Sequence, residues 1–126
     1  MDYKNELTRD EAIFFLDMVG SVKSPNKKTK STRVKPYYSI LNDRDSDDFK
    51  KFIDIYKSLK HILPERKQMI MDEIYGINKP GVSLKTVASS INITRERVRQ
   101  ICHEAEVAMA KEIVRRLGGI SNLKQA

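Results

Sequence analysis

Five long polar side chains stand close together in the C-terminal third of the sequence: Arg95, Glu96, Arg97, Arg99 and Gln100. Arginine can donate two parallel hydrogen bonds to guanine, glutamine can pair at two points with adenine, and glutamate can accept a hydrogen bond from cytosine. On a helix with about 100° per residue, Arg95, Glu96 and Arg99 project to one side together with Gln100. These residues therefore suit the reading of DNA base edges, although a solvated charged helix face would carry the same residue types.

The neighbouring residues supply the elements that would present this polar face. Ala88 is small enough for a second helix to cross closely above it, and Asn92 tolerates the left-handed conformation that a sharp turn needs. Thr94 can cap the second helix through its side-chain oxygen. Residues 83–101 therefore predict a helix-turn-helix, whose second helix meets base edges in the major groove. Its core-facing side is predicted to comprise Val98, Ile101, Cys102, Ala105, Ala108 and Met109.

Residues that could support catalysis or bind a metal are few. His61 and His103 lie far apart in the sequence, and Cys102 is the single cysteine. A zinc site needs several cysteines or histidines at short spacing, and a nucleophile needs a neighbouring base. A glycine-rich phosphate loop is also missing from the sequence. We therefore expect no enzymatic activity, no metal site and no cofactor.

The sequence also carries no recognisable targeting or membrane segment. Acidic residues occupy the N-terminus, where a secretory signal needs a basic start followed by an apolar run. No stretch of about 18 apolar residues occurs, which is the length that a membrane helix needs. We therefore expect a cytoplasmic protein that does not contact a membrane.

The charge of the chain is positive and unevenly distributed. The formal net charge is +7, from 24 Lys and Arg against 17 Asp and Glu, which favours a polyanionic partner. Residues 23–35 contain several cations and no acidic residue. Such a segment can be a flexible linker or an arm that follows the phosphate backbone, and the sequence leaves both interpretations open. Its cations are Lys23, Lys27, Lys28, Lys30, Arg33 and Lys35.

The distribution of apolar residues predicts an all-α protein, a small helical bundle with a C-terminal helix-turn-helix. We expect an N-terminal helical segment over residues 1–20. The stretch 21–45 is rich in Ser, Lys and Pro at its start and indicates a flexible basic linker. The DNA-binding domain is predicted to occupy residues 46–126.

Individual helices are predicted from caps and periodicity. Thr8 can cap a helix over 8–19, and residues 46–62 show apolar residues at spacings of three and four. Pro64 suits the first position of a further helix that ends near Tyr75, because its missing N–H has no partner there anyway. The apolar face of the first helix is predicted to comprise Ile13, Phe14, Leu16 and Val19.

The segment from Leu63 to Ile101 carries a longer pattern, LPERKQMIMDEIYGINKPGVSLKTVASSINITRERVRQI. It has an L-P-E-R opening, an apolar helix that ends in Tyr-Gly, a turn, and a helix-turn-helix that finishes in T-R-E-R-V-R-Q-I. This combination resembles region 4 of the sigma-70 family of bacterial transcription factors. The final string is close to a signature of that family.

The resemblance implies that the second helix of the motif reads a promoter minus-35 element during transcription initiation. It assigns the polar face to the bases and the flanking residues to the phosphate backbone. The implied base-reading residues are Arg95, Glu96, Arg99 and Gln100, and the implied backbone contacts are Thr94, Arg97, Lys85 and His103.

The resemblance also implies that bacterial RNA polymerase is a partner. The helix over residues 64–75 would help to form an apolar pocket for the flap-tip helix of the polymerase β subunit. Leu63, Ile70 and Ile74 are the candidate contacts, and the same residues would equally suit an ordinary hydrophobic core.

Two departures from the family pattern shape this expectation. The family continues after Gln-Ile with a basic run resembling E-K-A-L-R-K-L, whereas residues 102–108 read CHEAEVA, so we expect a weaker hold on phosphates here. Nothing upstream resembles region 2, the aromatic-rich element that captures the melted minus-10 strand. We therefore expect a split sigma factor that works with a second sigma-like subunit, or a regulator from a phage or mobile element.

The main alternative is a free-standing helix-turn-helix regulator that binds an operator as a homodimer and does not contact polymerase. Residues 104–117 would then form a dimerisation helix. A further alternative, an inhibitor that mimics region 4, has no need of the Arg-Glu-Arg-x-Arg-Gln face. The candidate dimer contacts are Val107, Met109, Ile113, Val114 and Leu117.

Overall fold

The computed structural model of the chain describes residues 7–26 and 35–119, and their regular secondary structure consists of helices joined by turns and loops. None of these residues forms a β-strand, which confirms the predicted all-α class. The elements in chain order are α1 (Arg9–Met18), α2 (Tyr38–Leu41), α3 (Asp47–Leu59), the 3-10 turn η1 (Lys60–Ile62), α4 (Glu65–Tyr75), α5 (Leu84–Ile91) and α6 (Arg95–Arg116).

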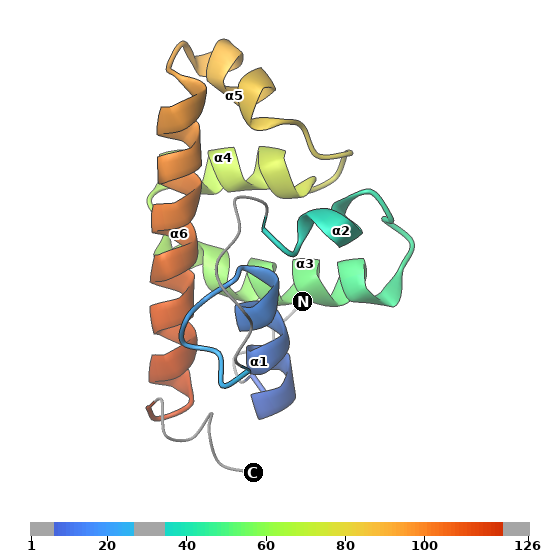
Figure 1. Cartoon of the computed structure of the whole chain (residues 1–126), viewed down its shortest axis with the longest axis vertical. Helices are drawn as coiled ribbons and strands as arrows, with labels where there is room; N and C mark the ends of the chain where they lie inside the picture. Colours follow the sequence, from blue (N-terminus) through green and yellow to red (C-terminus); the bar gives the residue numbers. More distant parts are fainter. Residues whose placement is uncertain (1–6, 27–34, 120–126) are drawn as a thin grey trace.

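The long helix α6 runs along one side of the molecule, and the shorter helices pack beside it (Figure 1). α5 and α4 pack against α6, and α3 leads through η1 to the same helix. α1 packs on α3 at the end of the molecule where α6 finishes. As a result, α5 and the first turns of α6 form the opposite end, farthest from α1 (Figure 1).

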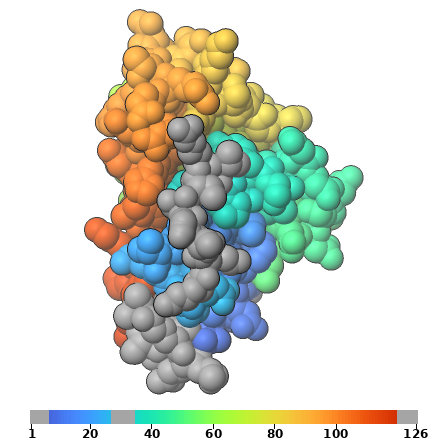
Figure 2. All heavy atoms as spheres, viewed as in Figure 1, coloured from blue at the N-terminus to red at the C-terminus, as the bar shows by residue number. Residues whose placement is uncertain are grey.

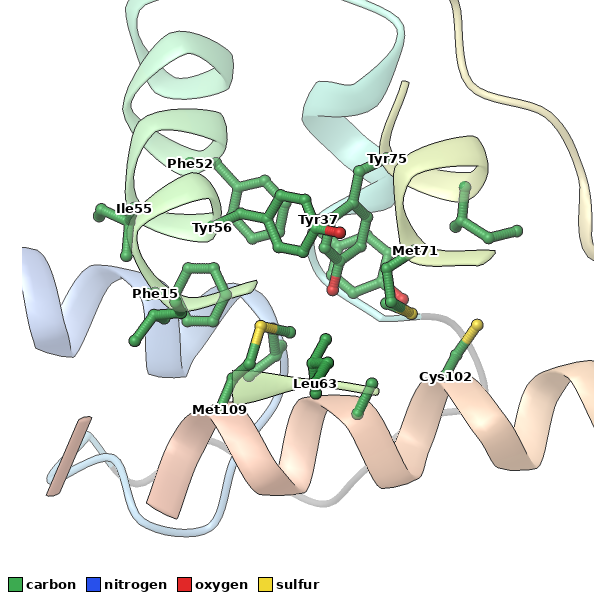
Figure 3. Packing of buried hydrophobic residues seen from close by; sticks show 14 of the residues in the cluster. Phe15, Tyr37, Phe52, Ile55, Tyr56, Leu63, Met71, Tyr75, Cys102 and Met109 are labelled. Carbon is green, nitrogen blue, oxygen red and sulfur yellow. The ribbon is translucent and has the colours of Figure 1, made fainter. Parts of the chain in front are cut away.

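An aromatic cluster lies at the centre of the hydrophobic core (Figure 3). Phe15 of α1 stacks on Phe52 of α3 with ring centroids 5.0 Å apart, and Phe52 meets Tyr75 of α4 edge-on at 4.9 Å. Tyr37 and Tyr56 pack edge-on against the same Tyr75 ring, at 5.0 and 4.9 Å. Aromatic rings prefer these stacked and edge-on arrangements. The cluster therefore joins α1, α3, α4 and the segment before α2 in one core.

Local signals in the sequence define the ends of several helices. Thr8 and Glu11 form a capping box at α1: Thr8 Oγ1 accepts from the Glu11 N–H at 3.1 Å, and Glu11 Oε1 accepts from the Thr8 N–H at 3.0 Å. The Ser46 side chain caps α3. Gly76 ends α4 with φ +86°, and a Cβ there would lie 2.7 Å from the Gly81 nitrogen. Glycine is therefore required at this turn.

The predicted helices are confirmed, with two differences in detail. Pro64 is the N-cap of α4 rather than its first residue, because its ψ of 152° is extended. The buried face of α1 is rotated relative to the expected one: Ala12, Phe15 and Leu16 are buried, whereas Ile13 and Phe14 are only partly covered. The stacking of α1 on α3 sets this rotation.

The predicted linker over residues 21–45 differs most from the structure. Tyr37 and Leu41 are buried core residues, and the Tyr37 N–H donates to the Met18 carbonyl at 3.0 Å. Near the start of the same stretch, Asn26 Nδ2 donates to Asp17 Oδ2 at 2.7 Å. Core residues of 7–19 together with Tyr37 and Leu41 thus pack with the region beyond residue 46, because apolar and aromatic side chains on both sides of the polar stretch become buried. The cations Lys27, Lys28, Lys30 and Arg33 lie outside the described residues.

Candidate nucleic-acid interface

The turn between α5 and α6 is built from capping residues that the sequence predicted. The Ser83 side chain caps α5 by accepting from the Thr86 N–H at 3.1 Å. Asn92 follows α5 in the left-handed region with φ 59° and ψ 47°, which confirms the expected sharp turn. Thr94 Oγ1 then accepts from the Arg97 N–H at 3.0 Å and begins α6. This arrangement fixes the direction in which α6 leaves the turn.

Small and apolar side chains hold the two helices together. Val87 and Ala88 of α5 are buried, as are Val98 and Ile101 on the facing side of α6. The Ile93 N–H donates to the Ala88 carbonyl at 3.1 Å, which closes the turn over this contact. The predicted role of Ala88 as a small residue at the helix crossing agrees with its burial.

The polar side of α6 faces solvent at the end of the molecule. Arg95, Glu96, Arg99 and Gln100 are all exposed, and His103 follows them one turn later, also exposed. Figure 2 shows this end in space-filling form, where the atoms of α5 and of the first turns of α6 form the top of the molecule. The predicted separation of α6 into a polar and a buried face is therefore present in the structure.

Two of the exposed side chains form an ion pair. Arg99 Nε donates to Glu96 Oε1 at 2.9 Å, and hydrogen bonding from Arg99 lowers the pKa of Glu96, while the same carboxylate raises the pKa of Arg99. Both side chains are consequently charged at neutral pH. Exposed pairs of this kind contribute little stability, so the pair can open when a better partner arrives.

Arg97 lies on a different side of α6 from the Glu96–Arg99 pair. Its guanidinium is 3.5 Å from Glu104 Oε2 and 3.3 Å from Gln100 Oε1. Lys67 of α4 is 3.2 Å from Glu104 Oε1, and this contact lowers the pKa of Glu104. Arg97 therefore points along the flank of α6 toward α4.

Three residues that the sequence proposed either for a polymerase contact or for the core are core residues. Leu63, Ile70 and Ile74 have exposed fractions of 4%, 1% and 1%. They belong to the same cluster as Met71, which Figure 3 shows pointing into the core. The exposed apolar side chain of α4 is instead Met69, half of whose surface is accessible.

Comparison with known protein families identifies the segment that contains α4, α5 and the first part of α6. Residues 61–109 match the family model of Sigma-70, region 4. The match contains the whole segment from Leu63 to Ile101 on which the resemblance rested and confirms that resemblance. A region 4 domain is a non-catalytic DNA-binding module, and it implies binding of promoter DNA and of RNA polymerase in transcription. No curated protein and no solved structure matches the chain.

The matched region 4 segment does not include α1, α2 or α3, which precede residue 61. These helices nevertheless pack into its core through Phe15, Tyr37 and Phe52. Among the described residues, no helix is long and apolar enough to cross a membrane, and no cluster of His, Cys, Asp and Glu could hold a metal ion. Burial raises the pKa of Cys102 to about 12, so its thiol stays protonated at neutral pH.

The sequence did not reveal one buried polar group within the region 4 segment. Glu106 of α6 is 2% exposed, and its Oε2 accepts from the Tyr75 hydroxyl at 2.8 Å. Lys35 Nζ lies 3.2 Å from Glu106 Oε1 and also donates to the Val19 carbonyl at 3.1 Å. A helical wheel could have located Glu106, because it lies one turn after Cys102 on the buried side. Its partners could not be identified, since they come from distant parts of the chain.

The C-terminal half of α6 is largely covered by the chain itself. Met109 and Ile113, two of the expected dimer contacts, are fully buried, and Figure 3 shows Met109 below Phe15. Val114 and Leu117 are partly buried against the same core. Val107 keeps 37% of its surface exposed. The apolar side of residues 104–117 is therefore used mainly for packing within one chain.

Proposed function

We propose that the protein is a promoter-recognition factor that binds double-stranded DNA through α5 and α6 and reads a minus-35-like element. The division of α6 into two faces carries this proposal. Val98, Ile101 and Cys102 hold one face in the core, while Arg95 and Arg99 stay exposed at the end of the molecule. A firmly held helix with long polar side chains near its N-terminus is what base reading in the major groove requires.

The proposed base-reading residues are Arg95, Glu96, Arg99 and Gln100. Glu96 and Arg99 pair with each other on the exposed face in the absence of DNA. On binding, Arg99 can exchange the carboxylate for the two acceptors of guanine, and the released Glu96 can accept from a cytosine. The pair thus restricts these two side chains before DNA arrives.

The proposed backbone contacts surround this face. Lys85 is exposed on the neighbouring helix α5, and His103 is exposed one turn beyond Arg99. Arg97 points toward the flank of α6, and Thr94 begins the helix. Cations at these positions would hold phosphates on either side of the groove and orient α6 without reading sequence.

We place the polymerase contact on the exposed face of α4, around Met69, with the flap of the β subunit as the proposed partner. Leu63, Ile70 and Ile74 are needed for the core and would act only as its support. A contact of this kind explains how a small DNA-binding surface can suffice. Once polymerase holds the protein at a promoter, DNA binding becomes effectively intramolecular, and two weak interactions reinforce each other.

The alternative of a homodimeric regulator receives less support from the structure. Its expected dimer contacts Met109 and Ile113 are buried in the core of one chain. A dimer would therefore have to form through another surface, and the exposed part of Val107 is small. The alternative remains the natural competitor in an experiment, because it predicts binding to DNA without polymerase.

Footprinting of the full-length protein on promoter DNA, with and without bacterial RNA polymerase, tests the proposal. We expect specific protection only with polymerase, because one helix-turn-helix buries only about 600 to 1,000 Å² on DNA. Arg99→Ala and Met69→Asp should each abolish this protection, the first through DNA and the second through polymerase. A two-fold symmetric footprint from the protein alone, with half-sites about one helical turn apart, would establish the homodimeric regulator instead.

A further inference from the structure

Glu106 occupies an unusual position for a carboxylate. It lies on the same stripe of α6 as Arg95, Arg99 and Cys102, because residues separated by four, seven and eleven positions fall on one side of a helix. At 1.5 Å per residue, Glu106 is about 10 Å along the axis from Arg99. The exposed part of this stripe is the proposed DNA-reading face, and its buried part contains Glu106.

Side chains from several parts of the chain contact the Glu106 carboxylate, and Tyr37 is one of them. The Tyr75 hydroxyl at the end of α4 donates to Oε2 at 2.8 Å, and Lys35, just before α2, lies 3.2 Å from Oε1. Lys35 is itself attached to the end of α1 through the Val19 carbonyl at 3.1 Å. Through Glu106, α6 therefore forms a hydrogen bond with the end of α4 and an ion pair with the segment that leads into α2.

Within one turn of Glu106, the buried apolar side chains of α6 constrain the rotation of the helix less than Val98, Ile101 and Ile113 do farther along it. The side chains within this turn are Cys102, Ala105, Met109 and Ala110. Alanine and cysteine are small, and methionine adapts its shape to the available space, so these side chains interlock weakly with a partner helix. The hydrogen bond from Tyr75 depends on direction, whereas the attraction of Lys35 depends mainly on distance. Buried polar groups of this kind can fix the register between helices.

We propose that Glu106 is a positioning residue for DNA recognition: its contacts with Tyr75 and Lys35 fix the rotation of α6 about its axis and so aim Arg95 and Arg99. The proposal rests on the proposed function, since it assumes that this face reads DNA. Recognition sites need their side chains held to within about 10–20° of the productive geometry, so a modest rotation of α6 would weaken base contacts. Contacts with phosphates tolerate such a rotation better, because they depend mainly on charge.

A matched pair of substitutions tests this role. Tyr75→Phe removes one of the hydroxyls that hold Glu106 and leaves the aromatic ring in place. Tyr56→Phe removes a hydroxyl from the same aromatic cluster, but one that donates to Asp72 Oδ1 at 2.7 Å and not to α6. The two variants change the core in the same chemical way, so a difference between them in DNA binding reports on Glu106 and not on core stability.

The measurement uses the full-length protein and DNA duplexes at low salt. A pool of duplexes randomised over one helical turn yields a preferred duplex, and fluorescence anisotropy then compares that duplex with a scrambled one of the same composition. We expect Tyr75→Phe to lower affinity for the preferred duplex by about fivefold or more, with affinity for the scrambled duplex unchanged. Tyr56→Phe should leave both affinities unchanged.

Glu106→Leu gives a second, independent readout. Glu106→Leu leaves the Lys35 ammonium and the buried Tyr75 hydroxyl without their partner, so we expect it to lower the melting temperature. At a temperature well below melting, we expect this variant to lose affinity for the preferred duplex and to keep its affinity for the scrambled one, a combination that a purely structural role does not produce. Glu106→Gln keeps an acceptor for Tyr75 and should restore most of the preference.

Two results would overturn the proposal, and they differ from each other. If the wild type prefers its duplex, Arg99→Ala removes the preference, and both Tyr75→Phe and Glu106→Leu fold and bind as the wild type does, the positioning role is refuted and the proposed function stands. If the wild type shows no preference for any duplex, either alone at low salt or together with RNA polymerase, and Arg99→Ala changes nothing in either case, both proposals fail.

Discussion

Among single residues, the polar side chains of α6 differ in exposure and in partners from one side of the helix to another. Arg99 is exposed and paired with Glu96, Arg97 points toward Glu104, and Glu106 is buried. Their chemical types overlap, so type alone does not distinguish a base-reading arginine from one that contacts phosphate. The distinction comes from the side of the helix on which each one lies.

The two arginines should therefore respond differently to substitution. Arg99→Ala should cost about 1–3 kcal/mol of binding free energy on the preferred duplex and relax the preference at one base pair. Arg97→Ala should weaken binding about equally on all duplexes and lower the salt slope by about one unit. Anisotropy titrations over a range of salt on preferred and substituted duplexes measure both effects. A loss confined to one base pair for Arg97→Ala would contradict its assignment to phosphate.

The buried Glu106 predicts a pH dependence of stability. Burial raises the pKa of Glu106, partly offset by Lys35, Tyr37 and Tyr75, and the nearby Cys102 thiol stays protonated. A carboxyl whose pKa is higher in the folded state stabilises the fold below its unfolded pKa, and this stability is lost as the pH rises through the folded value. Glu106→Gln should remove this loss, so its stability relative to wild type should increase from about pH 4 to pH 7. Urea unfolding at several pH values measures the difference in unfolding free energy between the variant and the wild type. A difference that does not change with pH would contradict the prediction.

At the scale of elements, the helix-turn-helix depends on close approach of α5 and α6 at Ala88, which is 5% exposed. Ala88→Leu should force the helices apart and cost about 1–3 kcal/mol of unfolding free energy, with loss of DNA binding. Ser89→Leu adds the same side chain at the next, exposed position of α5 and should change stability little. Thermal unfolding of the two variants provides the comparison. If the two variants were equally stable, the fold would not depend on the close approach of α5 and α6 at Ala88.

At the scale of the whole molecule, the region 4 segment shares its core with helices outside the family match. Phe15 of α1 is fully buried and stacks on Phe52, which contacts Tyr75 of α4. The N-terminal helices therefore act as a support for the DNA-binding end. Whether the cations of residues 23–35 follow the phosphate backbone stays a prediction, because most of them lie outside the described residues.

This shared core predicts that α1 and the helix-turn-helix unfold together. Phe15→Ala should cost about 3–5 kcal/mol and lower a single unfolding transition, although Phe15 is far from the DNA-reading face. Circular dichroism and the loss of DNA binding on heating should report the same midpoint in the wild type and in the variant. Two separate midpoints would show that α1 belongs to an independent unit, as the sequence alone suggested.

Local sequence patterns are enough to predict the helices and the outline of the site, because these depend on neighbours along the chain. The caps at Thr8, Ser83 and Thr94 and the left-handed Asn92 involve residues a few positions apart, and helical periodicity turns Arg99 about 100° away from the buried Val98. The polar face of α6 therefore follows from local sequence spacing.

Only the tertiary structure decided which apolar side chains are core and which polar groups meet. Leu63, Ile70 and Ile74 suited either a partner or the core, and packing settled them in the core. The sequence placed Tyr37 in a linker and Lys35 among the unpaired cations of that linker. In the structure, both side chains contact the Glu106 carboxylate of α6. Such contacts join residues far apart in sequence, so their existence depends on how the helices pack and not on any local pattern.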